Sequence, residues 1–120
     1  MTGSVDDSGR ALVRIRLKNP TGAMELELDA WIDTGFTGEL VLPQQSVASL
    51  GLPLGPTVMA RLANGSEIQF ETYTCFLEWF DEWKRIEVVA NQGQYPLLGV
   101  GLLLDHHLHI DYRAKILSIG

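Results

Sequence analysis

The sequence predicts an all-β domain with little helix, and two observations carry this prediction. Hydrophobic and polar residues alternate with a period of two along most of the chain, which is the pattern of half-buried β-strands. The chain has 120 residues, of which 46% are hydrophobic, so it is long enough and apolar enough to form one domain with its own core. We expect a flexible, polar segment over residues 1–10 and one domain over residues 11–120.

The first two predicted strands are the most regular ones. In residues 11–18, aliphatic side chains face one way and basic side chains face the other. An Asn-Pro-Thr-Gly turn follows over residues 19–22, and residues 24–30 alternate again with acidic residues on the polar face. These segments predict a β-hairpin.

A second hairpin is predicted near the middle of the chain. The pair Asn64-Gly65 lies between two alternating runs, residues 58–62 and 67–80, and Asn-Gly in this position is a strong signal for a tight hairpin turn. The alternation changes phase near Thr72, which predicts a bulge there. The remaining predicted elements are strands at residues 40–42, 86–90, 108–112 and 115–119, and a helix at residues 43–50 that stops at Gly51, while residues 97–104 are an apolar stretch with glycines.

Charge and composition exclude several classes of partner. The chain carries 9 Lys and Arg against 15 Asp and Glu, a net charge of -6, which is the wrong sign for binding a phosphate backbone. The single Cys75 forms no internal disulfide and no multi-cysteine zinc site, which suits a reducing cytoplasm. The longest apolar stretch, residues 96–104, is too short for a spanning helix, and no secretory signal is visible. We expect a cytoplasmic protein without a nucleic-acid or membrane partner.

Asp33 is the residue that most clearly suggests chemistry. It follows the apolar Ala30-Trp31-Ile32 directly and precedes Thr34 and Gly35. An aspartate at a strand end can activate a water molecule when a hydroxyl group orients it and a glycine lets backbone N–H groups approach. Taken alone, Asp-Thr-Gly is also an ordinary turn, so the rest of the chain must decide.

The order of motifs resembles the retropepsin-like aspartic proteases, and most closely their bacterial single-domain branch. An apolar strand leads into Asp33-Thr34-Gly35-Phe36-Thr37-Gly38, an Asn-Gly hairpin follows, and Leu97-Leu98-Gly99 precedes a short helix. The likeness spans nearly the whole chain. It implies a closed β-barrel of the acid-protease type with one or two short helices, and an endopeptidase that uses no cofactor and no metal.

The resemblance also implies roles for individual residues. Asp33 is then the catalytic aspartate, Thr34 ties two active-site loops together through its hydroxyl group, and Gly35 contacts the substrate through its backbone. Asn64 and Gly65 form the tip of a flap that closes over a peptide. The residues that pack against the catalytic loop or line a pocket are Phe36, Leu97, Leu98 and Gly99, with Leu97 as the better candidate for a pocket wall.

Phe36 departs from the retroviral pattern, in which the residue after the triplet is usually small. Its aromatic ring either narrows a side pocket or belongs to the core. Because of this departure, the peptide preferences of the retroviral members do not transfer to this chain.

The mechanism that the resemblance implies needs two carboxylates, and the chain has one Asp-Thr-Gly. A homodimer in which each Asp33 faces its copy solves this, and residues 115–119 are either the interface strand or an ordinary edge strand. The alternative functions are a non-catalytic peptide-binding or dimerisation module of the same fold, or an interaction domain in which Asp-Thr-Gly is only a turn. His107, His109 and Asp111 alternate on one strand face, which fits three metal ligands or, more simply, a solvated face.

Overall fold

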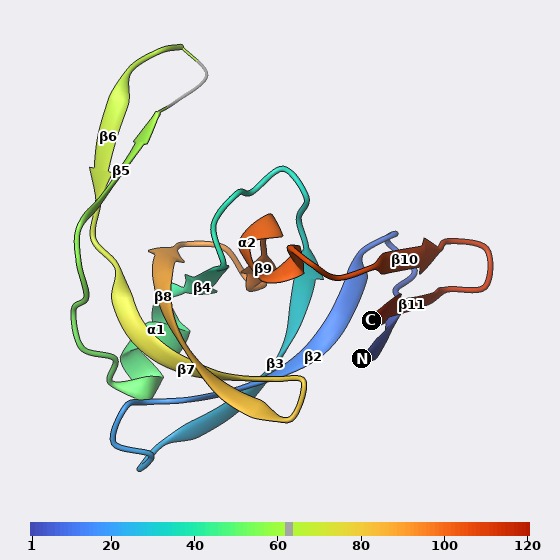
Figure 1. Cartoon of the computed structure of the whole chain (residues 1–120), viewed down its shortest axis with the longest axis horizontal. Helices are drawn as coiled ribbons and strands as arrows, with labels where there is room; N and C mark the ends of the chain where they lie inside the picture. The colour runs from blue at the N-terminus through green and yellow to red at the C-terminus, as the bar shows by residue number, and fades with distance from the viewer. Residues whose placement is uncertain (62–63) are drawn as a thin grey trace.

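The computed structural model describes residues 1–61 and 64–120. It confirms a mostly β structure with few helical residues (Figure 1). The strands and helices are, in chain order, β1 (Thr2–Val5), β2 (Ala11–Lys18), β3 (Glu25–Ile32), β4 (Leu40–Pro43), α1 (Gln44–Leu50), β5 (Val58–Arg61), β6 (Glu67–Phe70), β7 (Tyr73–Trp79), β8 (Glu82–Asn91), β9 (Leu97–Leu98), α2 (Val100–Leu103), β10 (Leu108–Asp111) and β11 (Ile116–Ile119).

One sheet forms the body of the molecule and closes on itself. Its strand order is β10-β11-β1-β2-β3-β9-β4-β8-β7, and β7 pairs back onto β2 through Leu17 with Leu77 and Lys18 with Phe76. This closure removes the free edge of β7. The core lies inside the ring, where Leu17, Leu77 and Leu98 are each 0% exposed.

The regular alternation of the first hairpin is confirmed in β2 and β3. The pairing joins Leu12 with Trp31 at one end and Lys18 with Glu25 at the other. Along β2 the apolar side chains are buried, while Arg14 and Arg16 are exposed and form ion pairs with acidic residues of β3. Exposed pairs of this kind add little stability, so burial of the aliphatic face holds the hairpin in place.

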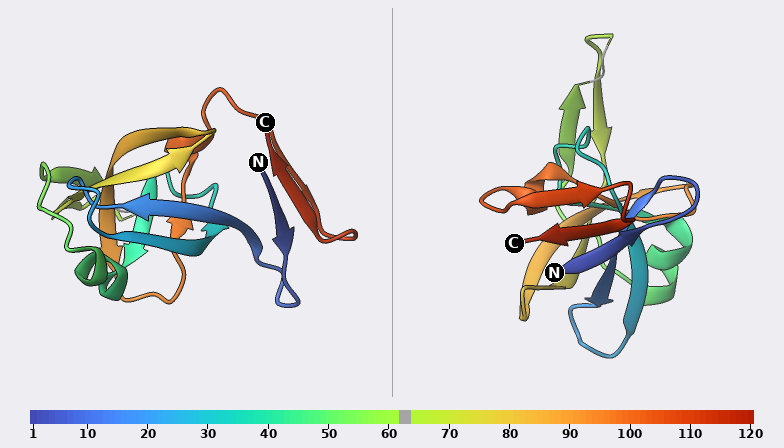
Figure 2. Two further views of the ribbon diagram at one scale, coloured as in Figure 1. Left: turned by 90° about the horizontal axis from the view of Figure 1, so that it is seen from below. Right: turned by 90° about the vertical axis from the view of Figure 1, so that its right-hand side faces the viewer.

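The hairpin β5–β6 protrudes from the body, as Figure 1 and the right panel of Figure 2 show. It forms a separate two-stranded sheet whose register joins Val58 with Phe70. The phase change near Thr72 is a break between β6 and β7 rather than a bulge within one strand. Buried Thr72 donates its hydroxyl hydrogen to the Pro56 carbonyl and accepts the Gly55 N–H at its own carbonyl, 2.8 Å away. The break lets the chain pass from the protruding hairpin into the body.

Residues 1–10, where we expected a flexible segment, contain strand β1. Strand β1 pairs with β11 on one side and with β2 on the other. Strands β1 and β11 approach each other closely because Gly3 has no side chain. A Cβ atom at this position would come within 2.8 Å of the Leu117 side chain. The sequence did not predict this strand, because its mostly polar side chains do not alternate with apolar ones.

The strand over residues 115–119 is not an edge strand of the single chain, and its role at a subunit interface stays a prediction. Within one chain, β11 is flanked by β1 and β10, so neither of its edges is free. Together these three strands form one end of the nine-stranded sheet, which extends beside the body as the left panel of Figure 2 shows. In the described part of the nine-stranded sheet, the terminal strand with an unpaired edge is β10.

Candidate active site

Asp33 lies directly after β3 and is held there by the short strand β9. The two strands run parallel, with Trp31 beside Leu97 and Ile32 beside Leu98. The Asp33 N–H donates to the Leu98 carbonyl oxygen at 2.9 Å, and the Trp31 N–H donates to the Pro96 carbonyl oxygen at 2.8 Å. The aspartate therefore extends a buried strand by one residue and then enters a loop.

The loop between Asp33 and β4 is fixed by backbone hydrogen bonds to the segment that begins α2. The Gly99 N–H donates to the Glu39 carbonyl at 2.9 Å, and the Gly101 N–H donates to the Gly38 carbonyl at 2.9 Å. A Cβ atom at Gly101 would lie 2.9 Å from the carbonyl carbon of Gly38, which explains the need for glycine there. Backbone hydrogen bonds to residues 99–101 thus hold this loop in place.

The Asp33 side chain is half-buried, and within the described residues its carboxylate forms no ion pair. Its Oδ1 atom accepts the Gly35 N–H at 3.0 Å, so the glycine backbone orients the carboxylate. The acidic residues on either side of it in sequence are both paired elsewhere: the Asp29 carboxylate lies 3.3 Å from Arg14, and the Glu39 carboxylate lies 3.6 Å from the Lys84 ammonium group. Thr34 is exposed, and its hydroxyl group has no hydrogen-bond partner among residues 1–61 and 64–120. Asp33 and Thr34 therefore present a carboxylate and a hydroxyl group at the end of β3.

The three residues after Pro96 differ in their burial. Leu98 is fully buried beneath the loop, while Leu97, on the opposite face of β9, is half-buried. Gly99 is buried, and a Cβ atom there would lie 2.5 Å from Cδ2 and 2.7 Å from the carbonyl oxygen of Phe36. Phe36 itself is half-buried.

A hollow of about 310 Å³ lies at the end of β3 that leads to Asp33. Two of its lining residues, Trp31 and Leu97, are neighbours on β3 and β9, and Trp31 precedes Asp33 by two positions. The complete lining is Arg10, Trp31, Asn91, Gly93, Gln94, Tyr95 and Leu97. The Trp31 side chain is 39% exposed here, although the tryptophan ring is among the most apolar surfaces a protein can bury.

Arg10 closes one side of this hollow. Its guanidinium carbon lies 4.7 Å from the centre of the Tyr95 ring and 5.8 Å from that of Trp31. Its Nε atom bonds to the Asp6 carboxylate at 2.7 Å. The backbone N–H of Arg10, together with the guanidinium, lowers the pKa of Asp6, and the carboxylate in turn raises the pKa of Arg10. The arginine head is thus fixed over the two rings.

Sequence reasoning did not identify Arg10, Trp31 and Tyr95 as site residues. They come from three distant parts of the chain, and Arg10 fell in the segment expected to be flexible. The signal that was present is a break in the alternation at Trp31, where an aromatic residue stands on the polar face of its strand.

The predicted flap residues lie at the end of the protruding hairpin. Asn64 and Gly65 form a turn in which Gly65 has a φ of +87°, a conformation that favours glycine. The Asn64 Oδ1 atom accepts hydrogen bonds from the Ser66 N–H at 3.0 Å and from the Ser66 hydroxyl group at 2.6 Å. On the strands of this hairpin, Met59 is 60% exposed and Ile68 is 39% exposed. Such exposed apolar side chains are typical of a surface that covers a partner.

The three alternating polar residues near the end of the chain do not converge. The Asp111 carboxylate accepts the backbone N–H groups of Arg113 and Ala114 at 3.0 and 2.9 Å, which makes it the cap of a turn. His107 and His109 are exposed. Within the residues that the structure describes, no three His, Cys, Asp or Glu side chains gather as metal ligands, and no helix is long and apolar enough to span a membrane.

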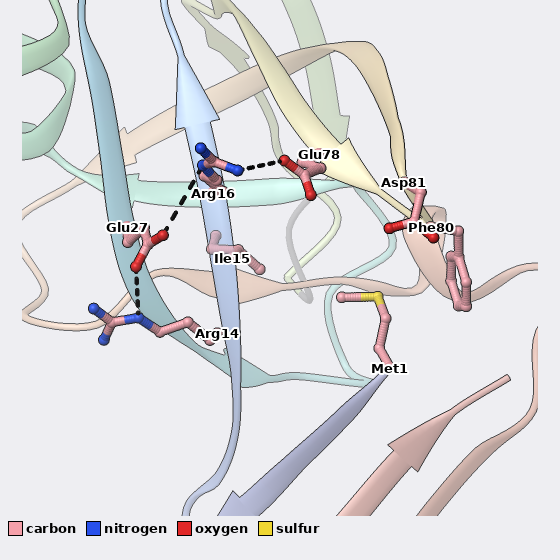
Figure 3. Close-up of a pocket in the computed structure, with 8 residues that line it drawn as sticks. All are labelled: Met1, Arg14, Ile15, Arg16, Glu27, Glu78, Phe80 and Asp81. Carbon is pink, nitrogen blue, oxygen red and sulfur yellow. Dashed lines mark hydrogen bonds and ion pairs between the residues drawn. The ribbon is translucent and has the colours of Figure 1, made fainter.

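The hollow in Figure 3 is larger, about 440 Å³, but it contains none of the predicted site residues. Its two arginines are paired with two of its acidic residues: an Arg16 nitrogen lies 3.0 Å from the Glu78 carboxylate, and the Arg14 Nε atom lies 3.5 Å from Glu27. Paired exposed charges leave little to attract a ligand. We therefore place the candidate site at Asp33.

Comparison with known proteins gives a consistent result for the fold. No protein-family model matches the chain, and no curated protein matches its sequence. Among solved structures, it is similar to a retropepsin-like aspartic protease from Rickettsia conorii, with a TM-score of 0.69, 17% identity, and coverage of 99% of this chain and 88% of that one. It is also similar to the EIAV protease complexed with an inhibitor, with a TM-score of 0.56, 14% identity, and coverage of 83% and 90%. The chain has the fold of the retropepsin-like aspartic proteases.

Proposed function

We propose that the chain is an aspartic endopeptidase that hydrolyses peptide bonds as a homodimer, with one Asp33 from each subunit. The observation that carries this proposal is the state of Asp33 in the single chain. Its backbone is fixed by the Leu98 carbonyl, its carboxylate is oriented by Gly35, and no second acid of its own chain joins it among the described residues. A carboxylate that is held by these hydrogen bonds but has no acidic partner among the described residues of its own chain fits one half of a pair shared between two subunits.

The chemistry follows from two carboxylates that share one proton. The ionised Asp33 removes a proton from a water molecule, whose oxygen then attacks the carbonyl carbon of the peptide bond. The protonated Asp33 of the other subunit donates its proton to the carbonyl oxygen, which forms a neutral tetrahedral intermediate. Collapse of this intermediate breaks the C–N bond as the amide nitrogen takes up a proton, and the pair returns to one shared proton. No metal or cofactor is needed in this scheme.

The hollow beside Asp33 and the hairpin β5–β6 provide surfaces for the peptide. The rings of Trp31 and Tyr95, with the aliphatic Leu97, favour a large apolar side chain next to the cleaved bond. The exposed apolar residues Met59 and Ile68 fit a flap that covers the peptide and excludes water.

The free edge of β10 is the place where a second subunit fits. His107 and Gly120 exchange two backbone hydrogen bonds, of 2.7 and 2.9 Å. In an antiparallel pair such exchanges recur at every second residue, so His109 and Asp111 bond to β11 while the backbone groups of Leu108 and Ile110 point to the free edge. Two β10 strands related by a two-fold axis can pair there, which would join the sheets of the two subunits into one.

Asp33→Asn tests the shared pair, because it retains the size of the side chain and removes its charge. The matched control is Asp29→Asn, which makes the same chemical change on β3 at an exposed carboxylate 3.3 Å from Arg14. We expect wild type and Asp29→Asn to cleave a peptide library, and Asp33→Asn to be inactive but still dimeric. Excess Asp33→Asn added to wild type should also inhibit cleavage, since mixed dimers hold one carboxylate.

The same experiment separates the alternatives. Cleavage by Asp33→Asn would contradict the proposal. A wild-type protein that binds peptides without cleaving them would instead indicate the non-catalytic peptide-binding module.

A further inference from the structure

Phe36 connects the catalytic loop to the segment behind it through its backbone. Its N–H donates to the Asp33 carbonyl oxygen at 3.2 Å, and its own carbonyl oxygen accepts the Val100 N–H at 2.8 Å. The residue therefore links Asp33 to the first residue of α2 through two backbone hydrogen bonds.

The Phe36 ring occupies space that two glycines leave open. A Cβ atom at Gly38 would lie 2.9 Å from Cε1 and 3.2 Å from Cε2 of the ring, and its three nearest neighbours are all atoms of this ring. A Cβ atom at Gly99 would lie 2.5 Å from Cδ2 of the same ring. Since real Cβ atoms do not approach other atoms so closely, the ring is in direct contact with both glycine backbones. We call Gly38 and Gly99 the glycine cradle.

We propose that Phe36 is a positioning residue, whose ring in the glycine cradle fixes the depth at which the catalytic loop presents Asp33. Gly38 belongs to the loop and Gly99 to the segment after β9, so one side chain holds both at a set distance. Without the ring, the loop keeps its backbone hydrogen bonds but loses the packing contact between Phe36 and the glycine cradle. Its catalytic consequence rests on the proposed function, whereas its effect on loop order does not.

The consequence for catalysis follows from the two-subunit site. Any freedom of the loop is doubled in the dimer, because both carboxylates move relative to each other and to the bound water. Misplacement of a reacting group by about 1 Å costs on the order of 100-fold in rate. We therefore expect Phe36→Ala to lower kcat by about 100-fold and to change KM by less than about threefold, with Phe36→Leu recovering most of kcat.

A double-mutant cycle tests the contact between ring and cradle. Gly38 has no left-handed φ, so alanine is allowed by its backbone, and Gly38→Ala conflicts with the Phe36 ring alone. Each single change should loosen the loop, while Gly38→Ala combined with Phe36→Leu should be nearer to wild type than Gly38→Ala by itself. A merely additive or worse double variant would contradict the proposal.

Hydrogen exchange of backbone amides measures the loop without any need for activity. The amides of Val100 and Gly101 bond to carbonyls of the loop, whereas the Gly55 amide bonds to Thr72 at 2.8 Å and serves as the internal control. In Phe36→Ala we expect exchange at Val100 and Gly101 to accelerate by at least about tenfold, and exchange at Gly55 to stay unchanged. Equal acceleration at all three amides, or none, would overturn the positioning role. An inactive wild-type protein with the expected exchange pattern would refute the proposed function and leave the positioning role standing.

Discussion

Leu97 and Leu98 are adjacent residues of the same type, and the structure predicts opposite consequences for their removal. Leu98 is 0% exposed and lies beneath the loop that holds Asp33. Leu97 points the other way, is half-buried, and lines the hollow with Trp31 and Tyr95. Truncation of each to alanine therefore separates the support of the catalytic loop from the wall of the pocket.

The magnitude for Leu98→Ala follows from its burial. Removal of a fully buried leucine side chain loses its transfer free energy and leaves a cavity, which together cost about 3 to 4 kcal/mol in the free energy of unfolding. For a chain of this size, about 1 kcal/mol corresponds to roughly 4 °C in Tm, so we expect Tm to fall by about 12 to 16 °C. Leu97 borders solvent and leaves no closed cavity, so Leu97→Ala should cost only about 1 kcal/mol.

The functional effects should be reversed. Leu97→Ala should raise KM for peptides with a large apolar side chain next to the cleaved bond by roughly fivefold, which corresponds to about 1 kcal/mol of lost contact. At a temperature where it is fully folded, Leu98→Ala should leave this preference unchanged. Urea unfolding and steady-state kinetics on the two variants measure both effects. Equal destabilisation by the two changes would show that Leu97 belongs to the core and that the hollow is not a pocket for the peptide.

Three further predictions concern pH, the cysteine and the subunit contact. Cleavage by the Asp33 pair should be bell-shaped in pH at constant dimer fraction, because the pair acts only with one shared proton; a rate that climbs steadily to about pH 9 would exclude it. Burial raises the pKa of the Cys75 thiol to about 12, so the folded protein should resist alkylation at pH 8. Its contribution to stability should be lost as pH rises above about 8.5, where the unfolded thiol ionises first; rapid labelling of the native protein would contradict this. Ile110→Pro should weaken the dimer by at least about 100-fold and leave the monomer folded, whereas Ile110→Ala should not, as sedimentation can measure.

The parts of the fold that the sequence predicted well are those in which side-chain burial and strand pairing agree. In β2 and β3, each apolar residue of the pattern faces the core, so alternation alone located the hairpin. The stop at Gly51 was equally local, because a φ of 60° at the end of α1 favours glycine. Such features depend on a few consecutive residues, and sequence patterns record them directly.

The features that were missed depend on contacts between distant residues. Strand β1 is held by backbone pairing on both sides, and its polar side chains carry no alternation. Alternation alone did not divide the apolar residues 97–104, and the short helix after Leu97-Leu98-Gly99 was expected only from the resemblance; the chain turns at Gly99, where a Cβ atom would lie 2.7 Å from the Phe36 carbonyl oxygen. The Asp-Thr-Gly triplet was visible as a local motif, whereas the hollow formed by Arg10, Trp31 and Tyr95 exists only after the sheet has closed.

Two independent features of the single chain, the site at Asp33 and the edge of β10, favour the addition of a second subunit. At Asp33, a rigid backbone presents a carboxylate and the exposed hydroxyl group of Thr34 without a protein partner among the described residues. At β10, a sheet that is otherwise closed ends in an edge whose backbone groups are unpaired and which carries no proline, lysine or bulge to protect it. Unpaired polar groups on a rigid backbone bind most tightly to a partner that is also rigid, because little conformational entropy is lost. A second copy of the chain related by a two-fold axis presents the same groups to the first. Assembly and catalysis are therefore expected to depend on one event, the pairing of two identical half-sites.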